Sequence, residues 1–591
     1  MLTRQRARWL AAEEKKEETL VFREENSNDF SDDEILPSSI ENADNDDDDD
    51  NFSGGNGNNK KYDGNNNNES LEAISGPNES SYLGKDRTTV WSKTEPPASK
   101  TLLKNILTEV AGVKGPAKNA KSPLEAWELF FDSSVIKKIT LFTNQRLEIL
   151  QKSFTRPRDC PLTDDEEIRA FLGLLYLSGS LKLSHTDTND IWATDGSAPI
   201  YFRSVMSENR FCTLQRALRF DDVNTRKERV TCDKLAPIRE LVDDMSRKFL
   251  DMYSVGECVT IDEMVFGFKG KCGFKQYLPM KPQSYGPKAF ALVDSDTFYT
   301  SAIEIYTGKQ QPGPFFIDNK PATVVKRISA SILGTGRNIT MVNWFSSIGV
   351  IDELQKEHRT TVVATIKKNK RELPPEFVNP KKRSVNSSLI GYNEGKVLVS
   401  YVPKKGKCVV VVSSMHQSGT IDVNTGDQQK PEIITFYNRT KGGVDTVDQL
   451  RGSYSVARCS NRWPLTLFYD ILDIVGINSQ IIYSENTNYT MPRKKYLKCL
   501  ATELTKPWMI RRLKIPSLSA ELRSSIINCA GIKTTKTHNY LESDRKRCAF
   551  CPSKKNRKTS TVCCHCSSRI CGEHTRAICK QCFNLDNTLE N

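Results

Sequence analysis

The stretch Cys258-Val-Thr-Ile-Asp262-Glu-Met-Val-Phe266 decides the fold class of this 591-residue chain. Its β-branched and apolar residues predict a strand. Side chains alternate along a strand, so Asp262 shares one face with Thr260 and Met264. A desolvated carboxylate without a partner costs several kcal/mol. The stretch alone therefore leaves two interpretations of Asp262, as a metal ligand or as a structural residue with satisfied hydrogen bonds.

Further strands and helices surround this stretch and predict a mixed α/β domain. Strands are expected near residues 274–278, 289–293, 298–305, 338–342, 362–366, 397–402 and 409–413, with helices near 322–333 and after 346. Two flanking blocks, 122–257 and 443–511, have helical patterns. In the first, Thr163 is expected to cap a helix over 164–177, because acidic residues fill its first turn. Trp463, at the start of another helix, is expected to pack in the core.

Charge divides the chain into an acidic tail and a basic body. Lys and Arg outnumber Asp and Glu by 85 to 73, a net charge of +12. Residues 1–100 hold 23 acidic and 12 basic side chains, so they carry −11 and the other 491 residues carry +23. Runs such as Asp46 to Asp50 cannot bury enough apolar surface to offset chain entropy, which predicts disorder over 1–121. The basic body indicates a nucleic acid or another polyanion as partner.

Neither the N-terminus nor the most apolar stretch favours secretion or membrane insertion. The first ten residues lead into Glu13-Glu14-Lys15-Lys16 without an apolar core, unlike a signal peptide. The apolar run 170–177 is too short to span a bilayer and is expected to form a buried helix. Without a secretory signal, clustered cysteines favour a metal site over disulfides.

A second acidic motif lies in Thr440-Lys-Gly-Gly-Val-Asp445-Thr-Val-Asp448-Gln-Leu450. The two glycines predict a loop that leads into a helix, and Asp445 and Asp448 project from one face of that helix. Acids at a helix N-terminus also stabilise the helix dipole, so this pair alone needs no ligand. Together with Asp262, the pair suggests a carboxylate cage for Mg²⁺.

Four motifs in a fixed order carry a resemblance to a known family. They are Asp262-Glu-Met-Val-Phe-Gly-Phe-Lys-Gly-Lys271, Arg337-Asn-Ile-Thr-Met-Val-Asn-Trp-Phe-Ser-Ser347, Lys441-Gly-Gly-Val-Asp-Thr-Val-Asp448 and Asn461-Arg-Trp-Pro464. From about residue 123 to 583, the chain resembles the piggyBac family of cut-and-paste DNA transposases. The resemblance implies an α/β, RNase H-like catalytic core over 258–367 and 432–454, with an insertion domain over 368–431. It also implies a helical dimerisation and DNA-binding domain split between 122–257 and 455–535, and a cysteine-rich zinc domain over 545–583.

One position departs from the family pattern. The resemblance implies three catalytic Asp residues and a further Asp, of which the first, third and further positions are Asp262, Asp445 and Asp448. The second position is Val342, which has no oxygen to bind a metal. Strand cleavage by two metals needs carboxylates that hold the ions about 3.5–4 Å apart. Asp352, ten residues downstream, is not expected to replace the missing carboxylate.

The C-terminal cysteines form four pairs with two-residue spacing: Cys548 and Cys551, Cys563 and Cys566, Cys571 and His574, Cys579 and Cys582. Eight ligands at this spacing suit two closed tetrahedral Zn²⁺ sites. By analogy with cross-brace fingers, the first and third pairs hold one structural ion, and the second and fourth pairs hold the other. Sequential pairing is the alternative.

Basic side chains near two of these motifs are candidate DNA contacts. Residues 545–591 hold 10 basic and 3 acidic side chains. One group is Arg545, Lys546, Arg547, Lys554, Lys555, Arg557 and Lys558, which also matches a split nuclear-import signal. The other is Lys269, Lys271 and Lys275, in a hairpin that follows the catalytic strand. Lysines that only protect an edge strand are the alternative for the hairpin.

These features predict a nuclear, zinc-containing protein derived from a piggyBac transposase that binds double-stranded DNA. Its nuclease step is expected to be lost at Val342, so Mg²⁺ is expected only if the catalytic core still functions. By resemblance it forms a homodimer, and no membrane partner is expected. One alternative is an active transposase that cuts and joins DNA at TTAA sites. Another is a chromatin or protein-interaction module whose zinc domain binds a protein.

Overall fold

The structure is a computed structural model that describes residues 80–97, 107, 109–279, 281–532, 545–563 and 568–575. Within these residues, eleven strands form one sheet in the order β1-β2-β11-β12-β13-β10-β9-β5-β7-β6, with β8 paired to β7 off that path. The strands are β1 (Ser81–Leu83), β2 (Val90–Ser92), β5 (Cys258–Val265), β6 (Lys275–Tyr277), β7 (Tyr285–Asp294), β8 (Thr300–Tyr306), β9 (Asn338–Met341), β10 (Thr361–Thr365), β11 (Ser388–Asn393), β12 (Lys396–Lys404) and β13 (Lys407–Ser413). The expected mixed α/β character is confirmed.

The middle of the sheet fixes the position of Asp262. β5 pairs antiparallel with β7, and β7 pairs antiparallel with β8. On its other side, β5 pairs in parallel with β9, and β9 pairs in parallel with β10. Ile261 lies opposite Met341 in this register. Asp262 and Val342, each one residue further along its chain, therefore stand side by side just beyond the last paired residues of these two strands, where β9 ends and β5 continues to Val265.

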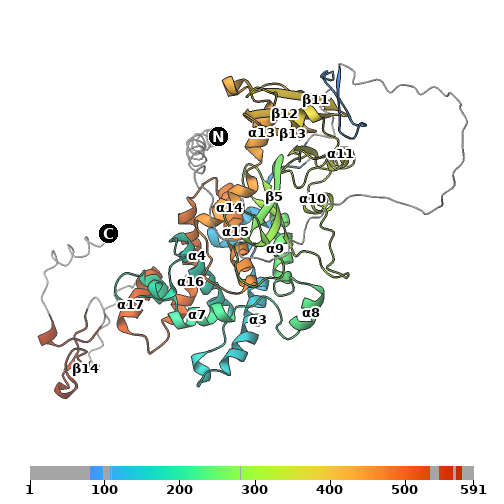
Figure 1. Cartoon of the computed structure of the whole chain (residues 1–591). Helices are drawn as coiled ribbons and strands as arrows, with labels where there is room; N and C mark the ends of the chain where they lie inside the picture. The colour runs from blue at the N-terminus through green and yellow to red at the C-terminus, as the bar shows by residue number, and fades with distance from the viewer. Residues whose placement is uncertain are drawn as a thin grey trace, which may run out of the picture. The chain divides into compact units, whose positions relative to one another are not determined.

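The segment expected as an insertion domain continues this sheet. β13 pairs antiparallel with β10, and β12 and β11 follow in order. A small apolar cluster that includes Val397, Tyr401 and Ile433 packs beside them. Figure 1 shows these strands together with α13 (Glu432–Thr440), and β5 beside α14 (Gly443–Ser453). The segment 368–431 thus adds strands to the same sheet instead of building a sheet of its own.

The expected disordered tail over 1–121 is wrong for its described part. Residues 81–92 form the hairpin β1–β2, and Ser92 of β2 pairs with Tyr392 of β11. Trp91 is fully buried and its Nε1 donates to the carbonyl of Glu372 at 2.9 Å. The composition of the tail is dominated by Asp and Asn runs, which hid this short apolar segment. Residues 1–79, 98–106 and 108 lie outside the described residues.

Helices flank the sheet in the two blocks where the sequence predicts them. The first block holds α2 (Pro123–Glu128), α3 (Ser133–Gln151), α4 (Asp165–Ser180), α5 (Thr188–Ile191), α6 (Ile200–Val205), α7 (Glu208–Ala217), α8 (Arg226–Cys232) and α9 (Arg239–Met252). The others are α10 (Pro321–Ser329), α11 (Ile348–Lys356), α12 (Pro375–Val378), α15 (Trp463–Thr487), α16 (Arg493–Arg512) and α17 (Ala520–Cys529). The short pair β3 (Gly112–Val113) and β4 (Tyr253–Ser254) joins the segment that precedes the first block to the end of that block.

The N-terminal cap of α4 and the burial of α15 bear on the predictions for these helices. The cap of α4 is Asp164, which accepts from the N–H groups of Glu166 and Glu167, whereas the expected cap Thr163 donates its hydroxyl to Glu167. An Asp side chain caps a helix in the same way as Thr, so the predicted cap was wrong by one residue.

α15 is long and apolar enough to cross a membrane, but 78% of its most apolar window is buried inside the protein. Packing therefore explains its apolar character.

Candidate acidic centre and nucleic-acid interface

β5 and α14 bring the predicted carboxylates together. The Thr260 hydroxyl donates at 2.6 Å to the carbonyl of Thr440, the last residue of α13, and so holds the chain that leads into α14 against β5. Gly443 makes that approach possible, because a Cβ there would lie 2.6 Å from Oγ1 of Thr260. Asp262 on β5 then faces Asp445 and Asp448 on α14. The expected grouping of these three carboxylates is observed.

A lysine that the sequence analysis did not predict lies among the three carboxylates. Nζ of Lys281 is 2.6 Å from Oδ1 of Asp445, and 3.8 Å from Oδ2 of both Asp262 and Asp448. Lys281 belongs to the loop between β6 and β7, 19 residues after Asp262. No local pattern joins it to the acidic motifs, so only the fold reveals the contact.

Burial and charge set the ionisation of this centre. Burial raises the pKa of Asp262 to about 6, although the Lys281 ammonium opposes the shift. Burial also raises the pKa of Asp448, against Arg451, which donates to Asp448 at 2.8 Å. Burial lowers the pKa of Lys281, but the surrounding carboxylates, Asp262 first, outweigh this effect and raise it. The ammonium and the carboxylates therefore stabilise one another in their charged forms.

Val342 and Asp352 behave as the sequence predicts. Val342 follows β9 and packs its half-buried side chain against the hydrophobic core. Its carbonyl accepts from the N–H of Phe345 at 3.1 Å and from the Ser346 hydroxyl at 3.0 Å. Asp352 lies on α11 and forms an ion pair with the buried Lys396. That lysine keeps Asp352 engaged away from the acidic centre.

The donor set at this centre does not fit a pair of Mg²⁺ ions. Two metals need carboxylate oxygens on both sides of the reacting phosphate. Here the position beside Asp262 is an apolar Val342, and an ammonium group lies within ion-pair distance of each remaining carboxylate. What the arrangement provides chemically is a carboxylate cluster whose charge is partly neutralised by one ammonium group.

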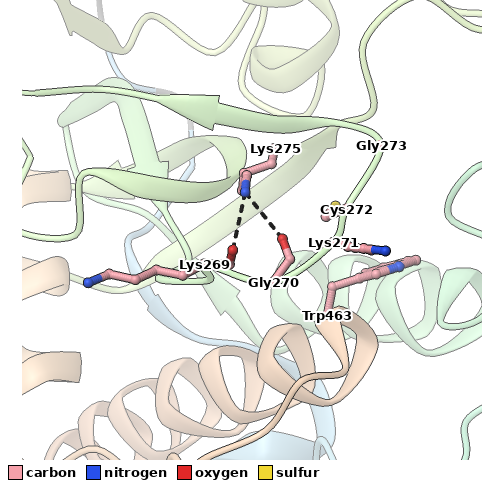
Figure 2. A pocket seen from close by; sticks show the side chains of 7 residues that line it. All are labelled: Lys269, Gly270, Lys271, Cys272, Gly273, Lys275 and Trp463. Carbon is pink, nitrogen blue, oxygen red and sulfur yellow. Dashed lines mark hydrogen bonds between the residues drawn. The ribbon is translucent and has the colours of Figure 1, made fainter. Parts of the chain in front are cut away.

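The predicted lysine hairpin forms one wall of an open hollow of about 610 Å³. Figure 2 shows Lys269, Lys271 and Lys275 around it, with the Lys271 side chain close to Trp463 of α15. Lys269 and Lys271 are exposed. Nζ of Lys275 instead donates to the carbonyls of Lys269 and Gly270, both at 3.2 Å, and so closes the hairpin. Trp463 packs edge-on against Phe274 at 5.0 Å, so the expectation of a core Trp is only half right.

A second cavity, of about 290 Å³, is also lined by Trp463. Its lining includes Arg219, Arg226 and Arg462 beside Phe220. Burial lowers the pKa of Arg219 to about 9 and that of Arg462 to about 10, with neighbouring arginines adding to both shifts.

The charged groups of this cavity already have partners. Arg226 forms an ion pair with Asp221, and NH2 of Arg462 donates to the carbonyl of Leu218 at 2.6 Å. The sequence analysis missed these arginines, although Arg462 lies within the quoted motif Asn461-Arg-Trp-Pro464. The cavity gathers more positive charge than Asp221 alone can neutralise.

Residues 545–575 bring the first and third cysteine pairs together. Cys548, Cys551, Cys571 and His574 place their ligand atoms within 4.8 Å of one another. Sγ of Cys551 is 3.5 Å from Sγ of Cys571 and 3.7 Å from Nδ1 of His574. A tetrahedral site with Zn–S bonds of about 2.3 Å has edges of about 3.8 Å, so this set fits a closed Zn²⁺ site.

The grouping matches the cross-brace prediction for one ion. Cys563, the sequential alternative, is described but does not belong to this cluster. Cys566, Cys579 and Cys582, which are predicted ligands of the other ion, lie outside the described residues.

The same segment joins its two basic runs on a short ladder. β14 (Lys546–Arg547) pairs antiparallel with β15 (Lys558–Thr559), with Arg547 opposite Lys558. Arg545, Lys554 and the other predicted contacts in these runs are exposed. Arg557 forms an ion pair with Glu573, and Lys555 lies 3.9 Å from the same carboxylate. The ladder therefore concentrates positive charge beside the Cys₃His cluster.

Comparisons with known proteins agree with this architecture. A family model described as Transposase IS4 matches residues 122–480, more than half of the chain. The human PiggyBac transposable element-derived protein 3 is 23% identical over 382 residues, covering 60% of this chain and 60% of the relative. The human Chimeric ERCC6-PGBD3 protein matches at the same identity, covering 60% of this chain and 34% of the relative. The chain thus spans less than two thirds of either relative.

A solved structure extends the match to three dimensions. The cryo-EM structure of a piggyBac transposase synaptic complex with hairpin DNA superposes with a TM-score of 0.71 at 34% identity. The match covers 80% of this chain and 100% of that chain. The family model, the relatives and the shared fold agree that the chain belongs to the piggyBac family of transposases.

Proposed function

We propose that this protein is a nuclear, double-stranded DNA-binding protein derived from a piggyBac transposase, and that it no longer cleaves DNA. The observation that carries the proposal is Val342, which stands beside Asp262 where the family pattern has a catalytic Asp. The remaining carboxylates are already paired with Lys281. With one anchor missing, Mg²⁺ lacks the oxygens that strand cleavage requires.

The architecture supports an RNase H-like core in this proposal. The antiparallel strands β8, β7 and β5, followed by the parallel strands β9 and β10, form the layer that carries Asp262. The helical blocks 122–257 and 455–535 then form the DNA-binding and dimerisation domain, and 368–431 is the insertion. In this division the core would be retained as a scaffold for DNA.

The DNA surface in this proposal has Trp463 at its centre. Trp463 lines one hollow with the exposed Lys269 and Lys271, and a second cavity with Arg219 and Arg462. Lysine and arginine neutralise phosphates, and an aromatic ring between them can stack on a base or a sugar. The ladder of Arg547 and Lys558 beside the Cys₃His cluster would supply a second contact, with Zn²⁺ as the structural ion.

A cleavage assay tests the loss of nuclease activity. A supercoiled plasmid with matched transposon ends at TTAA sites would be incubated with the wild type and with Val342→Asp, in Mg²⁺ or Mn²⁺. We expect no nicked or linear product from the wild type. Restoring an electrostatic anchor in an active site is worth on the order of 10²-fold, so Val342→Asp should nick the plasmid at about that factor above the background rate without protein if the rest of the centre is intact. Efficient metal-dependent cleavage by the wild type would show instead an active transposase.

A binding titration tests the choice of partner. Fluorescence anisotropy with a labelled duplex would be repeated over a range of salt concentrations. A protein that neutralises six or more phosphates loses roughly 10³-fold in affinity between 50 and 200 mM salt. A flat salt response, with tight binding of a histone-tail peptide, would favour the chromatin-interaction module and contradict DNA as the partner.

A further inference from the structure

The acidic centre contains a feature that the loss of a metal ligand alone does not explain. Removing one carboxylate from a metal site leaves a smaller cluster of negative charge, which is unfavourable in a buried place unless a cation neutralises it. We propose that Lys281 is that cation: its ammonium group stands in for a divalent ion among Asp262, Asp445 and Asp448 and holds the centre together without metal. This inference rests on the proposed loss of two-metal chemistry.

The geometry of Lys281 is that of a central ion. Its Nζ lies 2.6 Å from Asp445 and 3.8 Å from both Asp262 and Asp448, so one ammonium group serves carboxylates from two elements. Side chains of Lys281, Asp262 and Asp448 are 13%, 10% and 11% exposed, whereas Asp445 is 64% exposed. The ammonium therefore enters the centre from the side of Asp445 and reaches the two buried carboxylates behind it.

The loop that carries Lys281 is held by its own hydrogen bonds. The N–H of Lys281 donates to the carbonyl of Leu278 at 3.2 Å, and the N–H of Leu278 donates to the carbonyl of Ser284 at 2.8 Å. Tyr277 and Tyr285 stack at 4.4 Å across the base of the same loop. Because the loop is closed in this way, Lys281 loses less conformational freedom on pairing than a lysine on an open surface.

The charges around the two buried carboxylates complete the argument. Arg451 is shared between Asp448 and Asp470, both at 2.8 Å, so it cannot neutralise Asp448 fully. Asp262 accepts from its neighbour's backbone, the N–H of Glu263, at 2.7 Å, and its ion-pair partner is Lys281. Val342 adds no charge beside it. Removing the Lys281 ammonium would therefore leave carboxylates without their cation, and a divalent ion could then bind to them.

Manganese binding to the purified full-length protein tests this inference. Free Mn²⁺ would be titrated by electron paramagnetic resonance, and the Tm would be measured with and without Mn²⁺, for the wild type, Lys281→Met, Lys281→Arg and Lys288→Met. Lys288 is the matched control, because it is 12% exposed and pairs with the single carboxylate of Glu263 at 2.7 Å. The Cys₃His cluster is common to all four proteins and cancels in the comparison.

We expect Lys281→Met to have a lower Tm than the wild type in the absence of metal, and to recover at least ~2 °C when Mn²⁺ is added. It should also bind more Mn²⁺ than the wild type. We expect neither the rise in Tm nor the extra Mn²⁺ binding in the other three proteins. The wild type and Lys288→Met keep the Lys281 ammonium in the centre, and Lys281→Arg replaces it with another cation.

Two results would overturn the inference. One is a wild type that binds Mn²⁺ as tightly as Lys281→Met with the same rise in Tm. The other is a Lys281→Met protein whose lower Tm does not respond to Mn²⁺, which would give Lys281 an ordinary packing role. If Lys281→Met does not fold, the titration of the wild type with Mn²⁺ still tests the inference. A rise in the Tm of the wild type with Mn²⁺ would contradict an internal cation, and an unchanged Tm would support it. DNA cleavage by the wild type would overturn the proposed function separately, since neither readout here depends on cleavage.

Discussion

Single residues decide how closely the acidic motifs approach one another. The sequence predicts that Asp262, Asp445 and Asp448 act together, because each motif carries its acids at a recognisable spacing. It does not predict Lys281, whose role depends on a loop that returns to the centre from elsewhere in the chain. Contacts of this kind arise from tertiary packing, and no short-range pattern encodes them.

Gly443 offers a test at this scale. An added Cβ would lie 2.6 Å from Oγ1 and 3.1 Å from Cβ of Thr260, both in a buried strand, so Gly443→Ala overpacks the contact between α14 and β5. We expect a loss of ~1–3 kcal/mol in the free energy of unfolding, measured by guanidinium denaturation. Gly442→Ala is the control, because its Cβ would meet only Oγ1 of Thr446 at 4.0 Å. Equal stability of the two variants would contradict this account of the Gly-Gly motif.

At the scale of elements, local sequence patterns predicted several of the strands and helices. They did not predict how all of the strands pair in the sheet. Apolar and β-branched composition identified β5, β7 and β8, and apolar helical patterns identified α3, α4 and α15, because these elements bury much of their length in the core. The strand β11 and the hairpin β1–β2 were missed. Each pairs with a neighbour in the chain, β11 with β12 and β1 with β2, and among the described strands only the single pair of Tyr392 with Ser92 joins the hairpin to the rest of the sheet. Because the composition of the tail is acidic and polar, the sequence analysis also did not predict that Trp91 is buried.

The helix α15 carries a buried acid whose ionisation can be tested. Asp473 accepts from the Ser455 hydroxyl at 3.0 Å and from the N–H of Val456 at 3.1 Å. Burial, helped by the neighbouring Asp470, nevertheless raises its pKa to about 7. The ordinary pKa of Asp is about 3.9, so the folded state favours the protonated form. The stability that this group contributes is therefore complete below about pH 4 and is lost as the pH rises through about 7.

Asp473→Asn should remove that dependence, because Asn stays neutral and keeps one oxygen as acceptor. We expect its Tm to fall less than the wild-type Tm between pH 5 and pH 8, as followed by scanning fluorimetry in a buffer series. Asp190→Asn, at an exposed position of α5, should keep the wild-type profile. Parallel profiles for Asp473→Asn and the wild type would show that Asp473 is ionised throughout.

Across the whole molecule, the cysteine spacing predicted a specific site, whereas the charge pattern predicted only a class of partner. The positive body indicated a polyanion, but only the structure gathers Arg219 and Arg226 around one cavity with Arg462, which comes from a segment far away in the sequence. The cysteine spacing predicted the ligands directly, since each pair is local and the metal geometry is strict. The Cys₃His cluster is therefore the part of the molecule that the sequence described best.

Metal removal provides the test at this scale. The bonds described for residues 548–575 join that segment to itself, as in Cys548, Cys551, Cys571 and His574. Structural Zn²⁺ contributes roughly 10–16 kcal/mol of apparent binding free energy in small domains that otherwise unfold. A strong chelator should therefore unfold this segment while the Tm of the sheet and its helices stays within ~1 °C of its starting value. Limited proteolysis would locate the first cuts, and mass spectrometry would count the metal.

Two cysteine variants make this prediction specific. Cys571→Ser removes a ligand and should lower the zinc content by about one ion per chain. Cys232→Ser, at an exposed position of α8 outside the cluster, should keep the wild-type zinc content. Since the ladder of Arg547 and Lys558 lies in the same segment, Cys571→Ser should also weaken DNA binding and reduce its salt dependence, because fewer phosphates are then neutralised. A fall in the Tm of the whole protein on chelation, or unchanged DNA affinity in Cys571→Ser, would show that the metal site is not an independently folded DNA contact.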